Sequence, residues 1–259
     1  MSKNLSEIIR GQIKNFSTLS ADQYFKFRSA PPDIPVKLTV HGEEILVRKR
    51  TPDLAVAMDS LGDEFELLGR LFDRNYDGLI VDAGGYIGTA AIKFAKMYPQ
   101  ATIVTIEPST LNLSILKKNI AKYPNIHPIQ AALFVRSGET IKLTKGAGQG
   151  EWAFTIAQDS GDRAGMEDVE EIVTINLKDI RAQFSGKSIG ILKLDIEGGE
   201  KVIFDEDAEE LAGIPAVFAE LHDRVVPDCA ASFSKFSKGR WIVKTGGEKY
   251  LSLMGKGLA

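Results

Sequence analysis

Apolar and polar residues alternate along the middle of the chain in a repeated pattern of strand and then helix. Short apolar runs at Leu79–Val81, Thr102–Ile106 and Ile126–Ala131 have the composition of buried strands. Helical periodicity follows the first two runs, at Thr89–Met97 and Ser109–Tyr123. Alternation of this kind predicts a parallel sheet that is covered by helices on both faces.

The pattern resumes after a β-rich excursion and ends in an antiparallel hairpin. A strand is expected at Ile189–Ile196, a helix at Glu200–Leu211 and another strand at Ala216–Leu221. Near the C-terminal end, Trp241–Lys244 and Tyr250–Met254 flank two glycines and predict a closing hairpin. The chain therefore continues one α/β sheet almost to its last residues.

The N-terminal part of the chain does not share this pattern. Residues 1–28 are polar with a weak helical spacing, and Val36–Val40 and Glu44–Arg48 alternate with a period of two, which predicts a hairpin. We therefore expect a helical and β-hairpin extension over residues 1–62 and a single catalytic or binding domain over residues 63–259.

A glycine turn follows the first strand of the predicted sheet. The sequence Asp-Ala-Gly-Gly-Tyr-Ile-Gly from Asp82 contains Gly84, Gly85 and Gly88 between a strand and a helix. Glycine allows the backbone to approach a ligand closely, because no side chain intervenes. The next strand ends in Glu107, where a carboxylate can bind both hydroxyls of a ribose. Together these features predict a nucleoside-cofactor site.

The acid before the glycines narrows the choice of cofactor. A dinucleotide site usually has the pattern G-x-G-x-x-G, whereas the Asp82 carboxylate would repel a pyrophosphate. S-adenosylmethionine carries a sulfonium and an ammonium group, so charge favours it, with Asp82 and the Gly84 backbone at its methionine end. The alternative is that Asp82 merely caps the following helix, whose N-terminus favours a carboxylate.

Polar residues also break the pattern of the later strands. The run Ile189–Ile196 includes Lys193 and Asp195, although a central parallel strand should be apolar on both faces. Glu220 and His222 lie at the end of the following strand. Either these strand ends open onto a polar cavity, or the strands lie at an edge of the sheet. For His222 a purely structural, hydrogen-bonded role is the alternative to a functional one.

Composition excludes several classes of protein. The net charge of −3 and the pI of about 5.8 provide no bulk attraction for nucleic acid. A single cysteine, Cys229, allows no disulfide framework and no cysteine-based metal site within the chain. We find neither a signal-peptide pattern nor an apolar run of the ~18 residues that a membrane span needs. A soluble cytoplasmic protein with no membrane partner is expected.

Four motifs stand in order along the chain: Val81-Asp-Ala-Gly-Gly-Tyr-Ile-Gly88, Thr105-Ile-Glu-Pro-Ser109, Leu192-Lys-Leu-Asp-Ile-Glu-Gly-Gly-Glu200 and Val217-Phe-Ala-Glu-Leu221. They resemble the motifs of the FkbM-family methyltransferases. The third motif is the most specific, and Gly85 stands where the family usually has another small residue. The resemblance covers roughly residues 63–222 and implies a class I methyltransferase (Rossmann-like) fold, with a seven-stranded, mostly parallel sheet. It also implies S-adenosylmethionine as methyl donor and O-methylation of a hydroxyl on a sugar or natural-product-type small molecule.

The resemblance and the patterns together give a set of candidate site residues. By analogy of fold, Pro108 should lie over the adenine and Ala131 near its edge. The expected cofactor-binding residues are Asp82, Gly84, Gly85, Tyr86, Gly88, Glu107, Pro108, Ala131 and Asp195.

Methyl transfer to an alcohol needs a base or a metal ion to assist the loss of the proton. The candidate catalytic residues are His222, Asp195, Glu220 and Lys193, with His222 slightly favoured over Asp195 as the base and Lys193 expected to neutralise the acids. A divalent ion held by Asp195 and Glu220 is a less favoured alternative, because two acids alone are weak evidence for a metal site.

Two other function classes stay open at this point. A nicotinamide-dependent oxidoreductase would carry the G-x-G-x-x-G turn and, in the short-chain type, a Tyr-x-x-x-Lys pair, and this sequence has neither. A non-catalytic nucleoside-binding module on the same fold would lose the turn glycines or the acids, and all are present. Binding of S-adenosylhomocysteine compared with NAD separates these classes.

Overall fold

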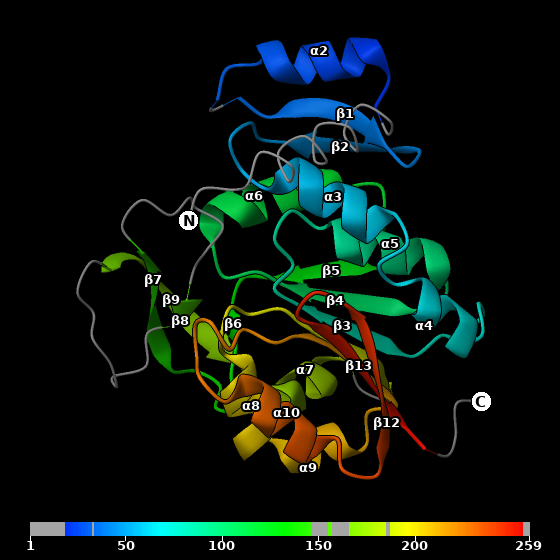
Figure 1. The fold of residues 1–259 in the computed structure, drawn as a ribbon, viewed down its shortest axis with the longest axis vertical. Helices are drawn as coiled ribbons and strands as arrows, with labels where there is room; N and C mark the ends of the chain where they lie inside the picture. The colour runs from blue at the N-terminus through cyan, green and yellow to red at the C-terminus, as the bar shows by residue number, and fades with distance from the viewer. Residues whose placement is uncertain (1–18, 33, 147–154, 157–165, 185–186, 256–259) are drawn as a thin grey trace.

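The computed structural model describes residues 19–32, 34–146, 155–156, 166–184 and 187–255, and a seven-stranded sheet forms their centre (Figure 1). The strand order is β12-β13-β11-β10-β3-β4-β5. The five strands from β11 to β5 are parallel, whereas β13 runs antiparallel to both of its neighbours. The strands are β3 (Leu79–Ala83), β4 (Thr102–Ile106), β5 (Ile126–Ile129), β10 (Ile189–Leu194), β11 (Ala216–Glu220), β12 (Arg240–Gly246) and β13 (Lys249–Met254).

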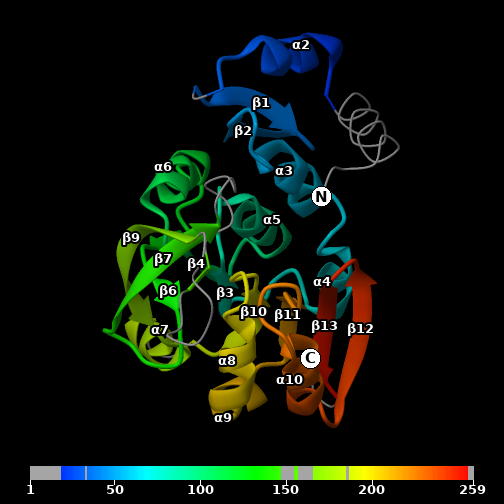
Figure 2. The ribbon, with the colours of Figure 1, turned by 60° about the vertical axis from the view of Figure 1, so that its left-hand side comes forward.

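Helices cover both faces of this sheet, as the alternating pattern predicted (Figures 1 and 2). Successive residues of β3 show why: Ile80 belongs to the apolar core on one face, and Leu79 and Val81 belong to the core on the other. The first face packs against α5 (Thr89–Met97) and α6 (Thr110–Asn119). The second face is covered by α7 (Leu177–Gln183), α8 (Glu200–Glu206), α9 (Ala208–Ala212) and α10 (Cys229–Phe236).

The N-terminal extension lies on the outside of the first helical layer. It contains α2 (Ala21–Ser29), the predicted hairpin of β1 (Val36–Val40) and β2 (Glu43–Val47), and α3 (Asp53–Leu61). The short helix α4 (Glu66–Leu71) follows and leads into β3. Apolar side chains of the hairpin and of α3 belong to the same core cluster as α5 and α6, so the extension is packed onto the sheet domain.

One side chain ties the hairpin to the domain. Asn119, at the end of α6, accepts a hydrogen bond from the Leu46 amide at 2.7 Å and donates to the Leu46 carbonyl at 3.2 Å. Its amide nitrogen also donates to the carbonyl of Ile87 in the glycine turn at 2.9 Å. Asn119 is buried, so these bonds satisfy its polar groups and fix the hairpin relative to the turn.

The β-rich excursion forms a small separate sheet beside β5. Its strands are β6 (Ala132–Leu133), β7 (Thr140–Gly146), β8 (Thr155–Ile156) and β9 (Met166–Ile175), in the order β6-β9-β7-β8. In the part of the chain that the structure describes, no helix has both the length and the apolar character that crossing a membrane requires.

The predicted elements differ from the observed ones in several places. Helices α3, α7 and α10 were not predicted, and the single helix expected over Glu200–Leu211 is two, α8 and α9. The strand expected over Ile189–Ile196 ends at Leu194, because Glu197 and Gly198 adopt positive φ angles of 53° and 101° and turn the chain. Of the weak helical pattern over residues 1–28, residues 1–18 lie outside the described part.

Candidate active site

A cavity of about 250 Å³ opens at the carboxyl ends of the parallel strands. Its floor is made by the ends of β3, β4, β10 and β11, and α3 of the extension supplies one wall. This is the position in which open α/β sheets bind their ligands. One part of the lining is apolar: Ile106, Pro108, Ala131, Ala132, Leu133 and Leu143. Another part is polar: Asp59, Ser60, Glu64, Lys193, Asp195, Glu197, Glu220 and Lys249.

The glycine turn is held between the end of β4 and the chain that leaves β10. Gly84 has a φ of 81°, and its amide donates to the Ile106 carbonyl at 3.0 Å. A Cβ atom on Gly84 would lie 1.8 Å from the carbonyl oxygen of Asp195. Gly85 has the same kind of restriction, since its Cβ would lie 2.2 Å from Thr105 Oγ1. The turn therefore needs glycine for close packing as well as for its backbone angle.

Glu107 follows β4 and lines the cavity with both carboxylate oxygens already hydrogen-bonded. Oε2 accepts from the Tyr86 amide at 2.8 Å, and Oε1 accepts from the Ser109 amide at 3.0 Å and from Asn112 Nδ2 at 3.2 Å. Burial raises the pKa of Glu107 to about 7, although these hydrogen bonds act in the opposite direction. Oε2 has a single donor and keeps a lone pair for a ligand hydroxyl, whereas Oε1 already has two donors. The carboxylate is therefore fixed in position and can still accept through Oε2.

The extension supports this acid through a buried network that sequence reasoning missed. Arg48 and Asp53 form a two-point ion pair at 2.9 and 3.0 Å, and Arg48 Nη2 donates to Asn112 Oδ1 at 2.9 Å. Asp53 also accepts a hydrogen bond from the Tyr86 hydroxyl. Asn112 and Tyr86 both donate hydrogen bonds to Glu107. The extension therefore fixes two of the residues that position the Glu107 carboxylate. Burial, and then the charge of Asp53, raises the pKa of Tyr86, which keeps its hydroxyl a donor.

A buried row of polar side chains lies under the glycine turn. The register pairs Lys193 of β10 with Asp82 of β3 and Asp82 with Thr105 of β4. Lys193 Nζ lies 3.1 Å from Asp82 Oδ1, and the Thr105 hydroxyl donates to Asp82 Oδ2 at 2.9 Å. Burial lowers the pKa of Lys193, but the charges of Asp82 and Asp195 outweigh it and hold the pKa above the usual value. Lys193 therefore lies as a cation between two acids, and its expected role of neutralising them stays a prediction.

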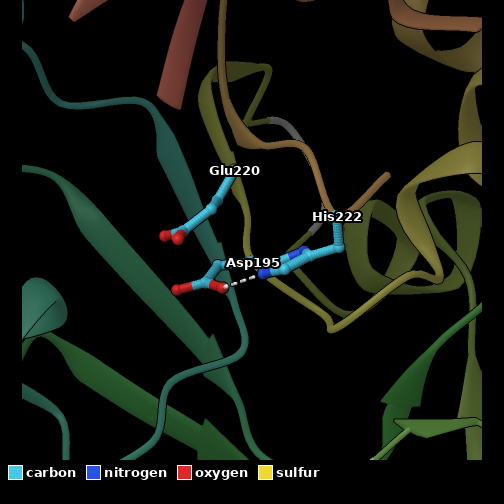
Figure 3. A group of neighbouring side chains, drawn as sticks. All are labelled: Asp195, Glu220 and His222. Atoms are coloured by element: carbon cyan, nitrogen blue, oxygen red, sulfur yellow. Dashed lines mark ion pairs between the residues drawn. The ribbon is translucent and has the colours of Figure 1, made fainter. Parts of the chain in front are cut away.

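Asp195, Glu220 and His222 converge at the other end of the cavity (Figure 3). His222 is 1% exposed, and its Nε2 lies 3.7 Å from Asp195 Oδ1 and 3.6 Å from Glu197 Oε2. Burial lowers the pKa of His222, but Glu200, Glu197 and Asp195 outweigh it and raise the pKa to about 9. The ring is therefore protonated at neutral pH. Burial, with the charge of Asp195, raises the pKa of Glu220.

Glu200 organises the chain around this cluster. It is fully buried at the start of α8, where its Oε1 accepts from the Ile196 amide at 2.7 Å and lies 3.0 Å from His222 Nδ1. Its Oε2 accepts from the Gly198 amide at 2.8 Å. One carboxylate therefore fixes both the turn after Asp195 and the imidazole ring. The Asp-Ile-Glu-Gly-Gly-Glu sequence carried this signal, because a buried acid that follows two glycines needs partners.

Most of the predicted site residues line the cavity, and three do not. Those that line it are Gly84, Gly85, Tyr86, Glu107, Pro108, Ala131, Lys193, Asp195 and Glu220. Asp82 is fully buried and faces Lys193 and Thr105, so it supports the turn from below. Gly88 faces Leu116 and Ile120 of the α6 region. His222 is buried behind the acids and is the third predicted residue that does not line the cavity. The choice between His222 and Asp195 as the base stays a prediction.

Several known proteins that are similar to this chain are methyltransferases. The Methyltransferase FkbM domain matches residues 82–229. Methyltransferase 1 of Beauveria bassiana (strain ARSEF 2860) is 25% identical over 189 residues, which cover 66% of this chain and 72% of that protein. A SAM-dependent methyltransferase from Agrobacterium tumefaciens aligns with a TM-score of 0.48 and 11% identity, over 88% of this chain and 72% of that chain. Precorrin-6y C5,15-methyltransferase from Geobacter metallireducens GS-15 aligns with a TM-score of 0.46 and 14% identity, over 85% and 98%.

The observed sheet confirms the predicted class I methyltransferase fold, with five parallel strands followed by an antiparallel hairpin. The family match extends over more than half of the chain, from Asp82 at the glycine turn to Cys229 beyond the acid and histidine cluster. This chain therefore belongs to the FkbM family of S-adenosylmethionine-dependent methyltransferases.

Proposed function

We propose that the enzyme methylates a hydroxyl oxygen of a small molecule such as a sugar or a polyketide-type natural product. One observation carries this proposal: a single cavity has Glu107 beside an apolar surface and Asp195 and Glu220 in its polar lining. The first part suits a nucleoside, and the second part can accept hydrogen bonds from a hydroxylated acceptor. Membership of a methyltransferase family removes the alternative of a nicotinamide oxidoreductase.

The residues around Glu107 fit S-adenosylmethionine. Gly84 and Gly85 of the turn line the cavity, so the turn backbone can lie directly against a ligand. Oε2 of Glu107 suits a ribose hydroxyl, and Pro108 and Ala131 offer an apolar surface for a flat base. When bound, the cofactor supplies a methyl group on a positively charged sulfur, which becomes a neutral thioether after transfer.

The polar part of the cavity suits the acceptor. The acceptor oxygen forms a bond to the methyl carbon as the carbon–sulfur bond breaks, and the hydroxyl proton must go to a base. Asp195 is the residue that we assign to take this proton, because its carboxylate lines the cavity and is held in position between two neighbours. Its Oδ2 lies 3.5 Å from Lys193 Nζ, and its Oδ1 faces the imidazolium of His222. Alignment of the two reacting centres supplies the rest of the acceleration.

The experiment is a screen of acceptors with S-adenosylmethionine labelled on its methyl group. We expect label to enter hydroxylated small molecules as methyl ethers, with equal release of S-adenosylhomocysteine. Asp195→Asn should lower turnover by about 10²-fold while binding S-adenosylhomocysteine as the unaltered enzyme does. Transfer to amines or to RNA in place of hydroxyls would overturn the proposed acceptor. Unchanged turnover of Asp195→Asn would remove the assigned base.

Cofactor affinity should depend on the ionisation of Glu107. Burial raises the pKa of Glu107 to about 7, and ribose hydroxyls donate more strongly to the ionised form. Bound ligand therefore favours the carboxylate, so affinity for S-adenosylhomocysteine should rise as the pH is raised through about 7. Titration calorimetry from pH 6 to pH 8 measures this change.

Glu107→Gln provides the matched control for this pH dependence. The amide keeps the shape but does not titrate, so affinity should fall by about 1–3 kcal/mol above pH 7 and lose its dependence on pH. If the affinity of Glu107→Gln for S-adenosylhomocysteine depends on pH as that of the unaltered enzyme does, another group is responsible for the pH dependence.

A further inference from the structure

The side chains of Asp195, Glu220 and His222 point into one common space beyond the ends of β10 and β11 (Figure 3). Each offers one ligand atom, and the three atoms lie within 4.8 Å of one another. Two are carboxylate oxygens, and the third is the Nε2 imidazole nitrogen of His222, which must give up its proton to a bound metal ion. Donors of these kinds, supplied by neighbouring strand ends, can bind a divalent cation after small side-chain adjustments.

The setting of His222 is a second observation that points to an ion. Its side chain is 1% exposed, and Glu200 Oε1 lies 3.0 Å from Nδ1. Its Nε2 faces Asp195 and Glu197 at 3.7 and 3.6 Å, which is beyond hydrogen-bonding distance. Among the described residues, Nε2 therefore has charged neighbours and no hydrogen bond. A buried carboxylate behind one ring nitrogen, with the other nitrogen facing further carboxylates, is how proteins orient histidine ligands of metal ions.

The balance of charge around Asp195, Glu220 and His222 also favours a bound cation. Four carboxylates face this cluster, from Asp195, Glu197, Glu200 and Glu220. Lys193 pairs with Asp195 but is shared with the buried Asp82, and Lys249 pairs with Glu220 at 3.7 Å but is shared with Glu64. Arg224 lies 3.4 Å from Glu197 and is half exposed. The basic side chains that reach the cluster are thus divided among further acids, so negative charge is left at its centre.

We propose that Asp195, Glu220 and His222 bind a divalent cation that accepts both oxygen and nitrogen ligands, of the Mn²⁺ type. The ion's role rests on the proposed function: an acceptor hydroxyl that ligates the ion becomes more acidic, as bound water does at metal centres. Its proton then passes to Asp195 Oδ2, the oxygen that faces Lys193, as the oxygen–methyl bond forms and the carbon–sulfur bond breaks. Glu200 positions the histidine ligand.

The test is a titration of the full chain with Mn²⁺, followed by the loss of the free-ion electron paramagnetic resonance signal. We expect one ion to bind per chain at pH 8. Glu220→Gln and His222→Gln should each weaken binding by about tenfold or more, the scale of the loss when a metal site is disturbed. Asp59→Asn is the matched control, because it removes the same charge from the cavity lining outside the cluster. It should change the affinity less than about twofold.

The outcomes separate this inference from the proposed function. Absence of Mn²⁺ binding at ~1 mM, or equal weakening by Glu220→Gln and Asp59→Asn, overturns the ion site even if methyl transfer to hydroxyls is found. A bound ion with the expected variant pattern supports the site even if no hydroxyl acceptor is methylated. Binding of S-adenosylhomocysteine by each variant shows that it is folded, and Glu220→Gln decides the result if His222→Gln does not fold.

Discussion

Replacing Lys193 by methionine is expected to lower the free energy of unfolding by about 3–5 kcal/mol, the usual effect of removing one partner from a buried ion pair. The Lys193 side chain is 7% exposed and Asp82 is not exposed at all, so the remaining carboxylate would be charged and buried. Only the Thr105 hydroxyl would remain as its hydrogen-bond donor among the described residues. Denaturant unfolding of the two proteins measures the difference.

Two further variants test whether the charge of Asp82 causes the loss. Asp82→Asn in the Lys193→Met background removes the charge and keeps an acceptor for Thr105, so the double variant should recover about 1–3 kcal/mol. Lys249→Met breaks ion pairs at the cavity edge, where Lys249 is 28% exposed, and should lower stability by about 1 kcal/mol or less. Equal losses for Lys193→Met and Lys249→Met would show that burial of the pair is not the cause.

The architecture of the sheet could be predicted because it depends on local patterns. Short apolar runs separated by helical periodicity define β3, β4, β5, β10 and β11, and the two-residue glycine turn defines the closing hairpin. Helices α7 and α10 are short, at seven and eight residues, and their amphipathic periods are too brief to stand out. Helix α3 follows Pro52 directly after the hairpin segment, and no element was predicted over its residues.

The support for the site could not be predicted in the same way, because it is made by contacts between distant residues. Arg48 and Asn112 are 64 positions apart, and nothing local indicates that an arginine after a hairpin holds an amide on α6. Glu107, the acid that follows β4, was predicted as a site residue from its place in the sequence alone. Its hydrogen-bond donors, Asn112 and the Tyr86 amide, appear only when the extension and the turn are packed together.

The residue pattern indicated which type of side chain lies at each strand end, but not whether that side chain is buried inside the sheet or reaches the cavity. Asp82 and Glu107 both follow apolar runs, yet the register places Asp82 beside Lys193 and Thr105 inside the sheet. Glu107 lies one residue past β4 and reaches the cavity. His222 likewise lies near Glu220 in the sequence but is buried behind it, so its neighbours decide its protonation. Depth and charge state thus depend on the tertiary fold.

Replacing Gly84 by alanine should abolish tight cofactor binding and lower the free energy of unfolding by about 2–5 kcal/mol. Two effects add here. An alanine at a φ of 81° is strained by about 1–2 kcal/mol, and a methyl group 1.8 Å from the Asp195 carbonyl oxygen forces the turn and the β10 end apart, at a cost of about 1–3 kcal/mol. Because that movement displaces the turn that lines the cavity, S-adenosylhomocysteine affinity should fall by about tenfold or more.

Gly138→Ala separates the two effects. Gly138 has a φ of 79°, close to that of Gly84, but a Cβ built there has no described atom within 4 Å, and the residue lies outside the cavity. Its replacement should therefore show the backbone strain alone, about 1–2 kcal/mol, with unchanged cofactor affinity. If Gly84→Ala loses no more stability than Gly138→Ala and binds S-adenosylhomocysteine normally, then the contact with Asp195 does not fix the turn. In that case the turn and the acid at the end of β10 are positioned independently, and the close approach of Gly84 to Asp195 has no role in forming the site.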